Sequence, residues 1–129
     1  MWIFQNNSFL SVVDKAPDPS KLVVRARCEG HIEAVFPNAN VLRDSTGDYL
    51  YRAFIDRQEV AEAMFHAVMG IQYNNFKNSI KDRKYHDACS SVWGVMSRLQ
   101  PVAPYSGSRL DRNYDLFKAP AKASKRGSK

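Results

Sequence analysis

Cysteine is scarce in this chain of 129 residues, where Cys28 and Cys89 are the only two. Two thiols cannot build a disulfide framework or a four-thiolate metal site, so we expect free thiols in a cytoplasmic protein. The sequence also lacks an apolar run near the ~20 residues that a membrane helix needs, which argues against a membrane span. Residues 1–13 have no basic segment and are interrupted by Gln5-Asn6-Asn7-Ser8, so we do not expect a signal peptide.

Catalytic and cofactor motifs are lacking as well. The chain contains no G-x-S-x-G, H-E-x-x-H, phosphate-binding loop, dinucleotide-binding G-x-G-x-x-G or EF-hand loop. We therefore expect no cofactor and no metal, and an enzyme is the weaker class of function. Hydrophobic residues make up 44% and charged residues 25% of the chain, which is typical of a soluble globular domain.

Acidic residues are few at the C-terminal end of the chain. Residues 1–101 hold 12 basic and 11 acidic side chains, whereas residues 102–129 hold 7 basic and 2 acidic ones, so the second segment carries +5 of the net charge of +6. Residues 118–129 contain five cations and no acid, and we predict a disordered basic tail there. Such a tail attracts polyanions such as nucleic acid, although a purely solubilising role explains it equally well. Residues 102–117 are more apolar, and we expect them to dock on the preceding domain.

The hydrophobic pattern predicts an α+β domain over residues 1–101. Apolar segments at 2–4 and 9–13 around a polar turn indicate a β-hairpin, and alternation over 21–27 indicates a third strand. Two more strands are expected at 40–43 and 49–55. Together they predict an antiparallel sheet of about five strands, with one short and two longer helices packed on one face.

The predicted helices cover residues 29–36, the stretch after Asp56 as far as Gly70, and residues 83–100. In the second helix we expect a buried stripe of four apolar residues at helical spacing: Val60, Met64, Val68 and Ile71. In the third helix, where Asp82 is the expected cap, we predict an inner face of eight residues: Tyr85, Ala88, Cys89, Val92, Trp93, Val95, Met96 and Leu99.

The opposite face of the third helix is unusually smooth. Ser90, Gly94 and Ser97 recur at i, i+4 and i+7 where a solvent-facing helix usually carries longer polar side chains. Small residues allow another backbone to approach closely, so we predict that this face is covered by residues 105–117 or by a protein partner. Chance composition is the alternative.

Two basic and aromatic groups of residues are candidates for binding single-stranded nucleic acid, because cations neutralise phosphates and rings stack on bases. The first comprises two strand arginines and a third that joins them if the strands pair: Arg25, Arg27 and Arg52. The second comprises four cations interleaved with Tyr73, Phe76 and Tyr85: Lys77, Lys81, Arg83 and Lys84. The tail adds Lys122, Lys125, Arg126 and Lys129. Strand arginines that only cover a polar sheet face are the alternative.

The three histidines offer the remaining chemical candidates. His66 shares a helix face with Glu59 and Glu62, which more often means a solvated polar face than a metal site. His31 and Glu33 form an H-x-E pair, but the P-C-x-x-C of zinc deaminases is missing. We expect His86 to be structural.

Several segments occur together in this chain. They are Met-Trp-Ile-Phe at 1–4, Phe-Leu-Ser at 9–11, Val-Arg-Ala-Arg at 24–27, Ile-Glu-Ala-Val-Phe-Pro at 32–37, Tyr-Asn-Asn-Phe-Lys at 73–77, and His-Asp-Ala at 86–88 followed by Val-Trp at 92–93. In these segments the chain resembles a family of small uncharacterised bacterial proteins that also occur on phages and plasmids. The resemblance covers residues 1–100 and implies a prokaryotic cytoplasmic or mobile-element context, including inhibition of a host defence as by an anti-CRISPR protein. It carries over no catalytic residue.

The sequence therefore leads to three hypotheses. The first is a non-enzymatic protein-interaction module with a protein partner, and the second is a nucleic-acid-binding protein that uses the tail and the two basic groups. The third is a small enzyme built around His31, His86 or the face with His66. A homodimer through an exposed sheet edge or through the small-residue face is compatible with all three.

Overall fold

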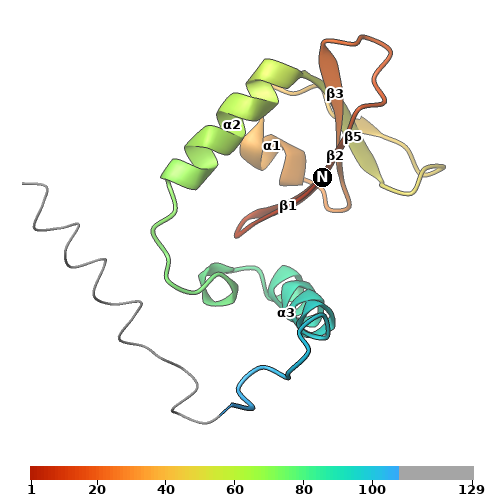
Figure 1. Cartoon of the computed structure of the whole chain (residues 1–129). Coiled ribbons are helices and arrows are strands. Elements are labelled where there is room, and N and C mark those ends of the chain that lie inside the picture. Colours follow the sequence, from red (N-terminus) through yellow and green to blue (C-terminus); the bar gives the residue numbers. More distant parts are fainter. Residues whose placement is uncertain (108–129) are drawn as a thin grey trace, which may run out of the picture. The chain divides into compact units, whose positions relative to one another are not determined.

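The computed structural model describes residues 1–107 (Figure 1). The chain divides into two compact units after Asp87. The first unit holds the sheet and the helices before residue 88. The described part of the second unit holds most of the last helix and the turns that follow it. The predicted contact of residues 102–117 with the domain and the predicted disorder of residues 118–129 fall wholly or largely outside the described residues.

The first unit is built on a five-stranded antiparallel sheet in the order β1-β2-β3-β5-β4. The strands are β1 (Trp2–Gln5), β2 (Ser8–Val13), β3 (Lys21–Ala26), β4 (Leu42–Arg43) and β5 (Tyr51–Asp56). The helices are α1 (His31–Val35), α2 (Arg57–Met69), the 3-10 turn η1 (Lys77–Ser79) and α3 (Arg83–Ser97). The predicted α+β class and the five-stranded antiparallel sheet are confirmed.

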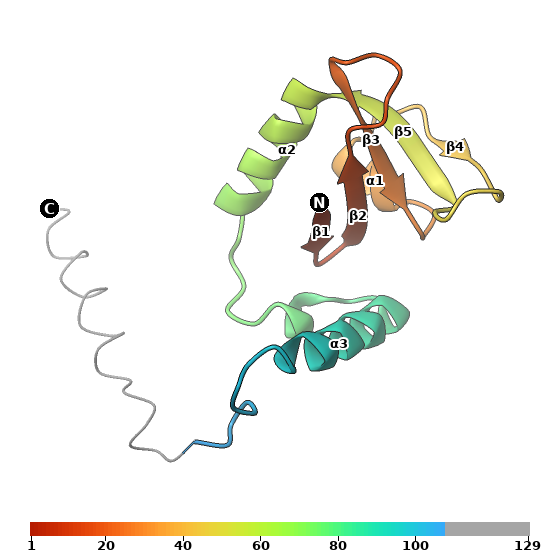
Figure 2. The same cartoon turned by 45° about the vertical axis from the view of Figure 1, so that its right-hand side comes forward.

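One face of the sheet forms the hydrophobic core with α1 and α2 (Figure 2). Because side chains alternate along a strand, Leu10, Val24 and Ala53 point to the same face, and each is fully buried. Ile32 from α1, Phe36 directly after α1 and Val60 from α2 cover them. The opposite face carries the alternate residues, among them an aromatic cluster in which the ring centroids of Phe4 and Phe9 lie 4.5 Å apart.

The predicted packing of α2 is wrong beyond its first two turns. Val60 is buried and Met64 is half-buried, but Val68 is 65% exposed and Ile71 is 53% exposed. The spacing of these residues is helical, but a groove separates the last turn of the helix from β1, so Val68 is not packed against the sheet. Asp56 does precede α2 as predicted, but its side chain makes no cap hydrogen bond and pairs instead with Lys21 Nζ at 3.2 Å.

Helix α3 begins as predicted. The backbone N–H of Tyr85 donates to Asp82 Oδ2 at 2.8 Å, which is the geometry of an N-terminal cap. Tyr85 and Cys89 are buried as expected. The predicted inner face is otherwise wrong, because Val92, Trp93, Val95, Met96 and Leu99 are between 38% and 76% exposed in the described structure, and Ala88 is exposed as well.

Candidate interaction surface

The outer edge of β1 is an open sheet edge without charged side chains. β1 pairs only with β2 in the described structure, and no residue from 2 to 13 carries a charged side chain. Natural proteins usually protect such an edge with lysine, proline or a bulge, because its unpaired backbone groups are a template for another strand. None of these devices is present along β1.

The hydrogen-bond pattern shows which backbone groups face outward. Met1 and Val12 exchange two main-chain hydrogen bonds, each 2.8 Å long. Hydrogen-bonded pairs alternate with non-bonded pairs in an antiparallel ladder, so Ile3 and Gln5 also bond to β2. The N–H and C=O groups of Trp2 and Phe4 therefore point away from β2, toward the open edge.

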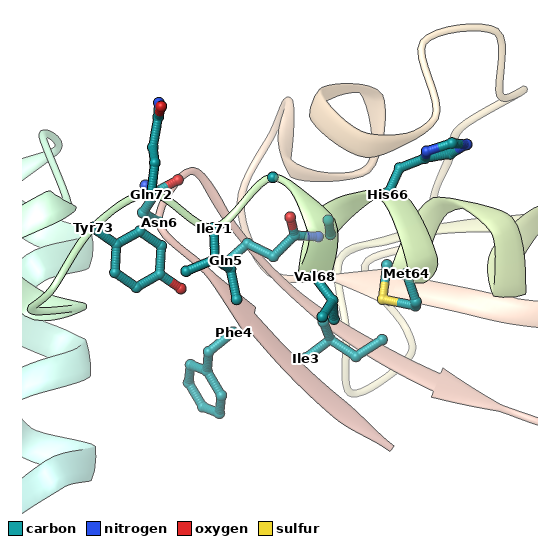
Figure 3. Close-up of a pocket in the computed structure, with 12 residues that line it drawn as sticks. Ile3, Phe4, Gln5, Asn6, Met64, His66, Val68, Ile71, Gln72 and Tyr73 are labelled. Atoms are coloured by element: carbon teal, nitrogen blue, oxygen red, sulfur yellow. The ribbon is translucent and has the colours of Figure 1, made fainter. Parts of the chain in front are cut away.

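A groove of about 410 Å³ runs between β1 and the end of α2. Figure 3 shows Ile3 and Gln5 of β1 facing Met64 and Val68 of α2 across it. The complete lining is Ile3, Phe4, Gln5, Asn6, Met64, His66, Ala67, Val68, Gly70, Ile71, Gln72 and Tyr73. No lysine, arginine, aspartate or glutamate lines this groove, and the ring of His66 is directed away from Ile3.

Exposed apolar side chains extend this groove over the surface of α2. Phe65, Val68, Met69 and Ile71 are between 53% and 71% exposed, and Trp2 at the strand edge is 68% exposed. An exposed apolar region that continues into a groove is typical of a protein-binding surface. We use the name β1–α2 surface for the open edge of β1, the groove, and the four exposed residues Phe65, Val68, Met69 and Ile71.

One buried polar atom in this surface has no partner. Gln5 Nε2 is inaccessible to solvent and makes no hydrogen bond within residues 1–107. An unsatisfied buried amide costs ~1–3 kcal/mol, so this side chain is a local source of instability at the end of β1.

The second unit has its own exposed apolar stripe. Its four exposed residues follow the i, i+3, i+4, i+7 spacing of a helix that docks in a groove; they are Val92, Val95, Met96 and Leu99. The small-residue face predicted to bind a protein is the half-buried set Ser90, Gly94 and Ser97. A Cβ atom built on Gly94 meets nothing within 4 Å, so no described residue covers that point.

The structure brings Arg25, Arg27 and Arg52 together, and all three contact Asp48 or Tyr49 in the loop before β5. Arg25 and Arg52 are direct partners across β3 and β5. The guanidinium carbons of Arg25 and Arg27 lie 4.6 and 4.1 Å from the centre of the Tyr49 ring, which is 4% exposed. These distances are those of cation–π contacts.

Hydrogen bonds complete this arginine–tyrosine cluster. Arg25 Nη2 donates to Ser11 Oγ at 2.7 Å, and its Nη1 lies 3.8 Å from Asp48 Oδ1. Arg27 Nη1 donates to the Asp48 carbonyl at 2.9 Å, and Arg52 Nη2 to the Tyr49 carbonyl at 3.4 Å. The arginines that we predicted to bind phosphates are thus occupied in holding the loop before β5, while their role toward nucleic acid stays a prediction.

The second predicted basic group lies on η1 and the start of α3. Lys81, Arg83 and Lys84 are exposed, and Lys77 is half-buried. Arg83 Nε lies 3.6 Å from Asp87 Oδ1, so part of its charge is balanced within the helix. The tail cations Lys122, Lys125, Arg126 and Lys129 lie outside the described residues.

The contacts of His31 could not be anticipated from the sequence. The backbone N–H of Phe9 donates to its Nδ1 at 3.1 Å, which requires a neutral ring with the proton on Nε2. Burial lowers the pKa of His31, which also favours the neutral ring. The Tyr85 ring lies edge-on to His31 at 5.2 Å. The Tyr85 hydroxyl shares its one proton between the carbonyl oxygens of Gln5 and Ser8, which lie 2.6 and 2.7 Å away. These bonds anchor the hairpin and do not activate a nucleophile.

The other catalytic candidates stay on the surface. Glu59, Glu62 and His66 are exposed, and Glu62 accepts a hydrogen bond from Gln58 at 3.2 Å. His86 Nδ1 lies 3.2 Å from Asp87 Oδ1, beside it in the chain. Among residues 1–107 no three histidine, cysteine or acidic side chains are grouped as metal ligands would be. Within the same residues, no helix combines the length and the apolarity that crossing a bilayer demands.

Searches of protein-family models, curated proteins and solved structures found no match to this chain.

Proposed function

We propose that this protein is a non-enzymatic protein-interaction module whose binding site is the β1–α2 surface. The observation that carries the proposal is the conjunction of an open strand edge with exposed apolar residues of α2 beside it. In β-strand addition, main-chain hydrogen bonds to the edge provide affinity, and pockets beside the strand select the side chains of the partner. The outward groups of Trp2 and Phe4 and the groove under Val68 supply these two elements.

The lining of the groove favours a neutral, apolar partner segment. No lysine or arginine lines the groove to attract phosphate, and no carboxylate lines it to attract a basic peptide. Nucleic acid is the less favoured partner also because Arg25 and Arg27 are engaged with Tyr49 and Asp48. A role as a phage or mobile-element accessory protein that inhibits a host system is the specific form of this proposal, and the family resemblance alone supports it.

The experiment is a pull-down from nuclease-treated bacterial lysate with the full chain and two variants. Val68→Glu places a charge in the groove at a residue that is 65% exposed, so folding should be kept. Leu42→Glu is the matched control, because Leu42 is 43% exposed on β4 at the other edge of the sheet.

We expect a stoichiometric protein partner that the wild type and Leu42→Glu retain and Val68→Glu loses. A partner retained equally by all three chains would contradict the proposed site. Recovery of nucleic acid in the untreated lysate, with loss of all partners on nuclease treatment, would favour the second hypothesis instead.

A further inference from the structure

We propose that the first occupant of the β1–α2 surface is a second copy of this chain, paired antiparallel along β1 about a two-fold axis at Ile3. The inference rests on the proposed function, since it names the partner of the same surface. It would join two five-stranded sheets into one continuous sheet. Such an interface is isologous, so each feature of the edge must complement itself.

The backbone of β1 meets this requirement in one register. Trp2 and Phe4 are the residues whose N–H and C=O groups face outward. When Trp2 stands opposite the partner's Phe4, both outward residues of each copy form hydrogen-bonded pairs. The same register places Met1 opposite the partner's Gln5, so the whole of residues 1–5 overlaps and no outward group is left unpaired.

The side chains agree with this register on both faces of the sheet. Ile3 would stand opposite the partner's Ile3 on the helix face, with their Cβ atoms ~4.5–5.5 Å apart. The partner's Ile3 then enters the groove beside Val68 and Met64 (Figure 3). On the other face Trp2 would pack against the partner's Phe4, an aromatic pair across strands of the kind that stabilises sheets.

Charge selects a copy of this chain over a charged partner. Residues 2–13 and the groove lining contain no lysine, arginine, aspartate or glutamate, and the register places the ammonium of Met1 opposite the partner's neutral Gln5, so no like charges stand directly opposite each other. The other sheet edge is a poor alternative, because β4 has only two residues and carries Arg43. Short and charged edges are those that resist strand addition.

The register is tested by cysteine cross-linking in the full chain, with Cys28→Ser to remove the exposed native thiol. Ile3→Cys should form an intermolecular disulfide under mild oxidation, because the two Ile3 positions face each other at the axis. Gln5→Cys is the matched control on the same strand face. Two Gln5 positions would lie about 13 Å apart, four residues along the strand, which is too far for a disulfide.

The association itself is measured by sedimentation equilibrium on the wild type, Trp2→Pro and Val68→Glu. Proline at position 2 removes an outward N–H and obstructs the partner strand, but leaves the bonds of Ile3 and Gln5 to β2 intact. We expect a wild-type dimer of twice 14.7 kDa, and a dissociation constant at least ten-fold higher in both variants. Val95→Glu, on α3, should dimerise like the wild type.

Three results would overturn the inference: a monomeric wild type at sub-millimolar concentration, a dimer that both variants leave unchanged, or Gln5→Cys cross-linking as readily as Ile3→Cys. A monomer that still captures a protein through Val68 would leave the proposed function standing. A monomeric chain that captures no protein would contradict both the dimer inference and the proposed function.

Discussion

His31 connects two segments of the first unit through one ring nitrogen. Its Nδ1 accepts the backbone N–H of Phe9, and Tyr85 packs against the ring. Protonation would turn this acceptor into a second donor and oppose the Phe9 N–H. A single proton at His31 therefore weakens the attachment of α1 to the β1–β2 hairpin.

This contact predicts a pH-dependent stability. Because the pKa of His31 is lower in the folded chain than its ordinary value of 6.5, the unfolded chain binds the proton more readily. The contribution of neutral His31 to the free energy of unfolding is complete above pH 6.5, and it is lost as pH falls through the pKa of His31 in the folded chain. Urea unfolding between about pH 7.5 and about pH 5.5 should show falling stability, and His31→Gln should flatten part of this dependence. The matched variant His66→Gln, at an exposed position, should keep the wild-type slope; equal slopes in all three chains would contradict the role of His31.

At the scale of elements, both longer helices begin against well-defined contacts and end with their apolar residues exposed. Val60 anchors the start of α2, and Tyr85 anchors the start of α3. Phe65 and Met69 on α2, and Val95 and Met96 on α3, are exposed. Helical periodicity shows that a stripe of residues shares one face, but the extent of the surface opposite decides how much of the stripe is buried.

Helix α3 carries a prediction of its own at Gly94. Glycine costs ~1 kcal/mol in a helix interior relative to alanine, and a Cβ atom at this position meets no described atom within 4 Å. Gly94→Ala should therefore raise the free energy of unfolding by about 1 kcal/mol, measured by denaturant titration. A destabilised Gly94→Ala chain would mean that the small-residue face packs against something in the free protein. Loss of a captured partner in a stable variant would assign the face with Ser90 and Ser97 to binding.

At the scale of the whole molecule, the surfaces differ in charge. No lysine, arginine, aspartate or glutamate lines the groove of the β1–α2 surface, and the arginine–tyrosine cluster pairs one of its three arginines, Arg25, with Asp48. Residues 102–129 carry most of the net positive charge. The C-terminal segment is therefore where we expect attraction to polyanions, and the first unit holds the apolar surface for which we propose association. The two properties can be separated by deletion and substitution.

We predict that any affinity for single-stranded DNA depends on residues 118–129. Deleting these residues should abolish binding in fluorescence anisotropy, whereas Arg27→Ala should leave it within about two-fold. Five cations correspond to a slope near −3.5 for log affinity against log salt, at about −0.7 per phosphate. If Arg27→Ala abolished binding and the deletion kept it, the result would contradict this prediction and would support nucleic-acid binding by the strand arginines.

The class and order of the elements could be predicted from the sequence, because alternation and helical spacing are local properties that can be read residue by residue. The hairpin, the strand with Arg25 and the cap at Asp82 all stand close to where the pattern places them. The contacts of Arg25 and Arg27 with the Tyr49 ring could not be predicted in this way, since they join residues more than twenty positions apart. The proposed binding surface also depends on tertiary structure: Val68 and Ile71 look like core residues in the sequence, but they line a groove beside β1 and are exposed.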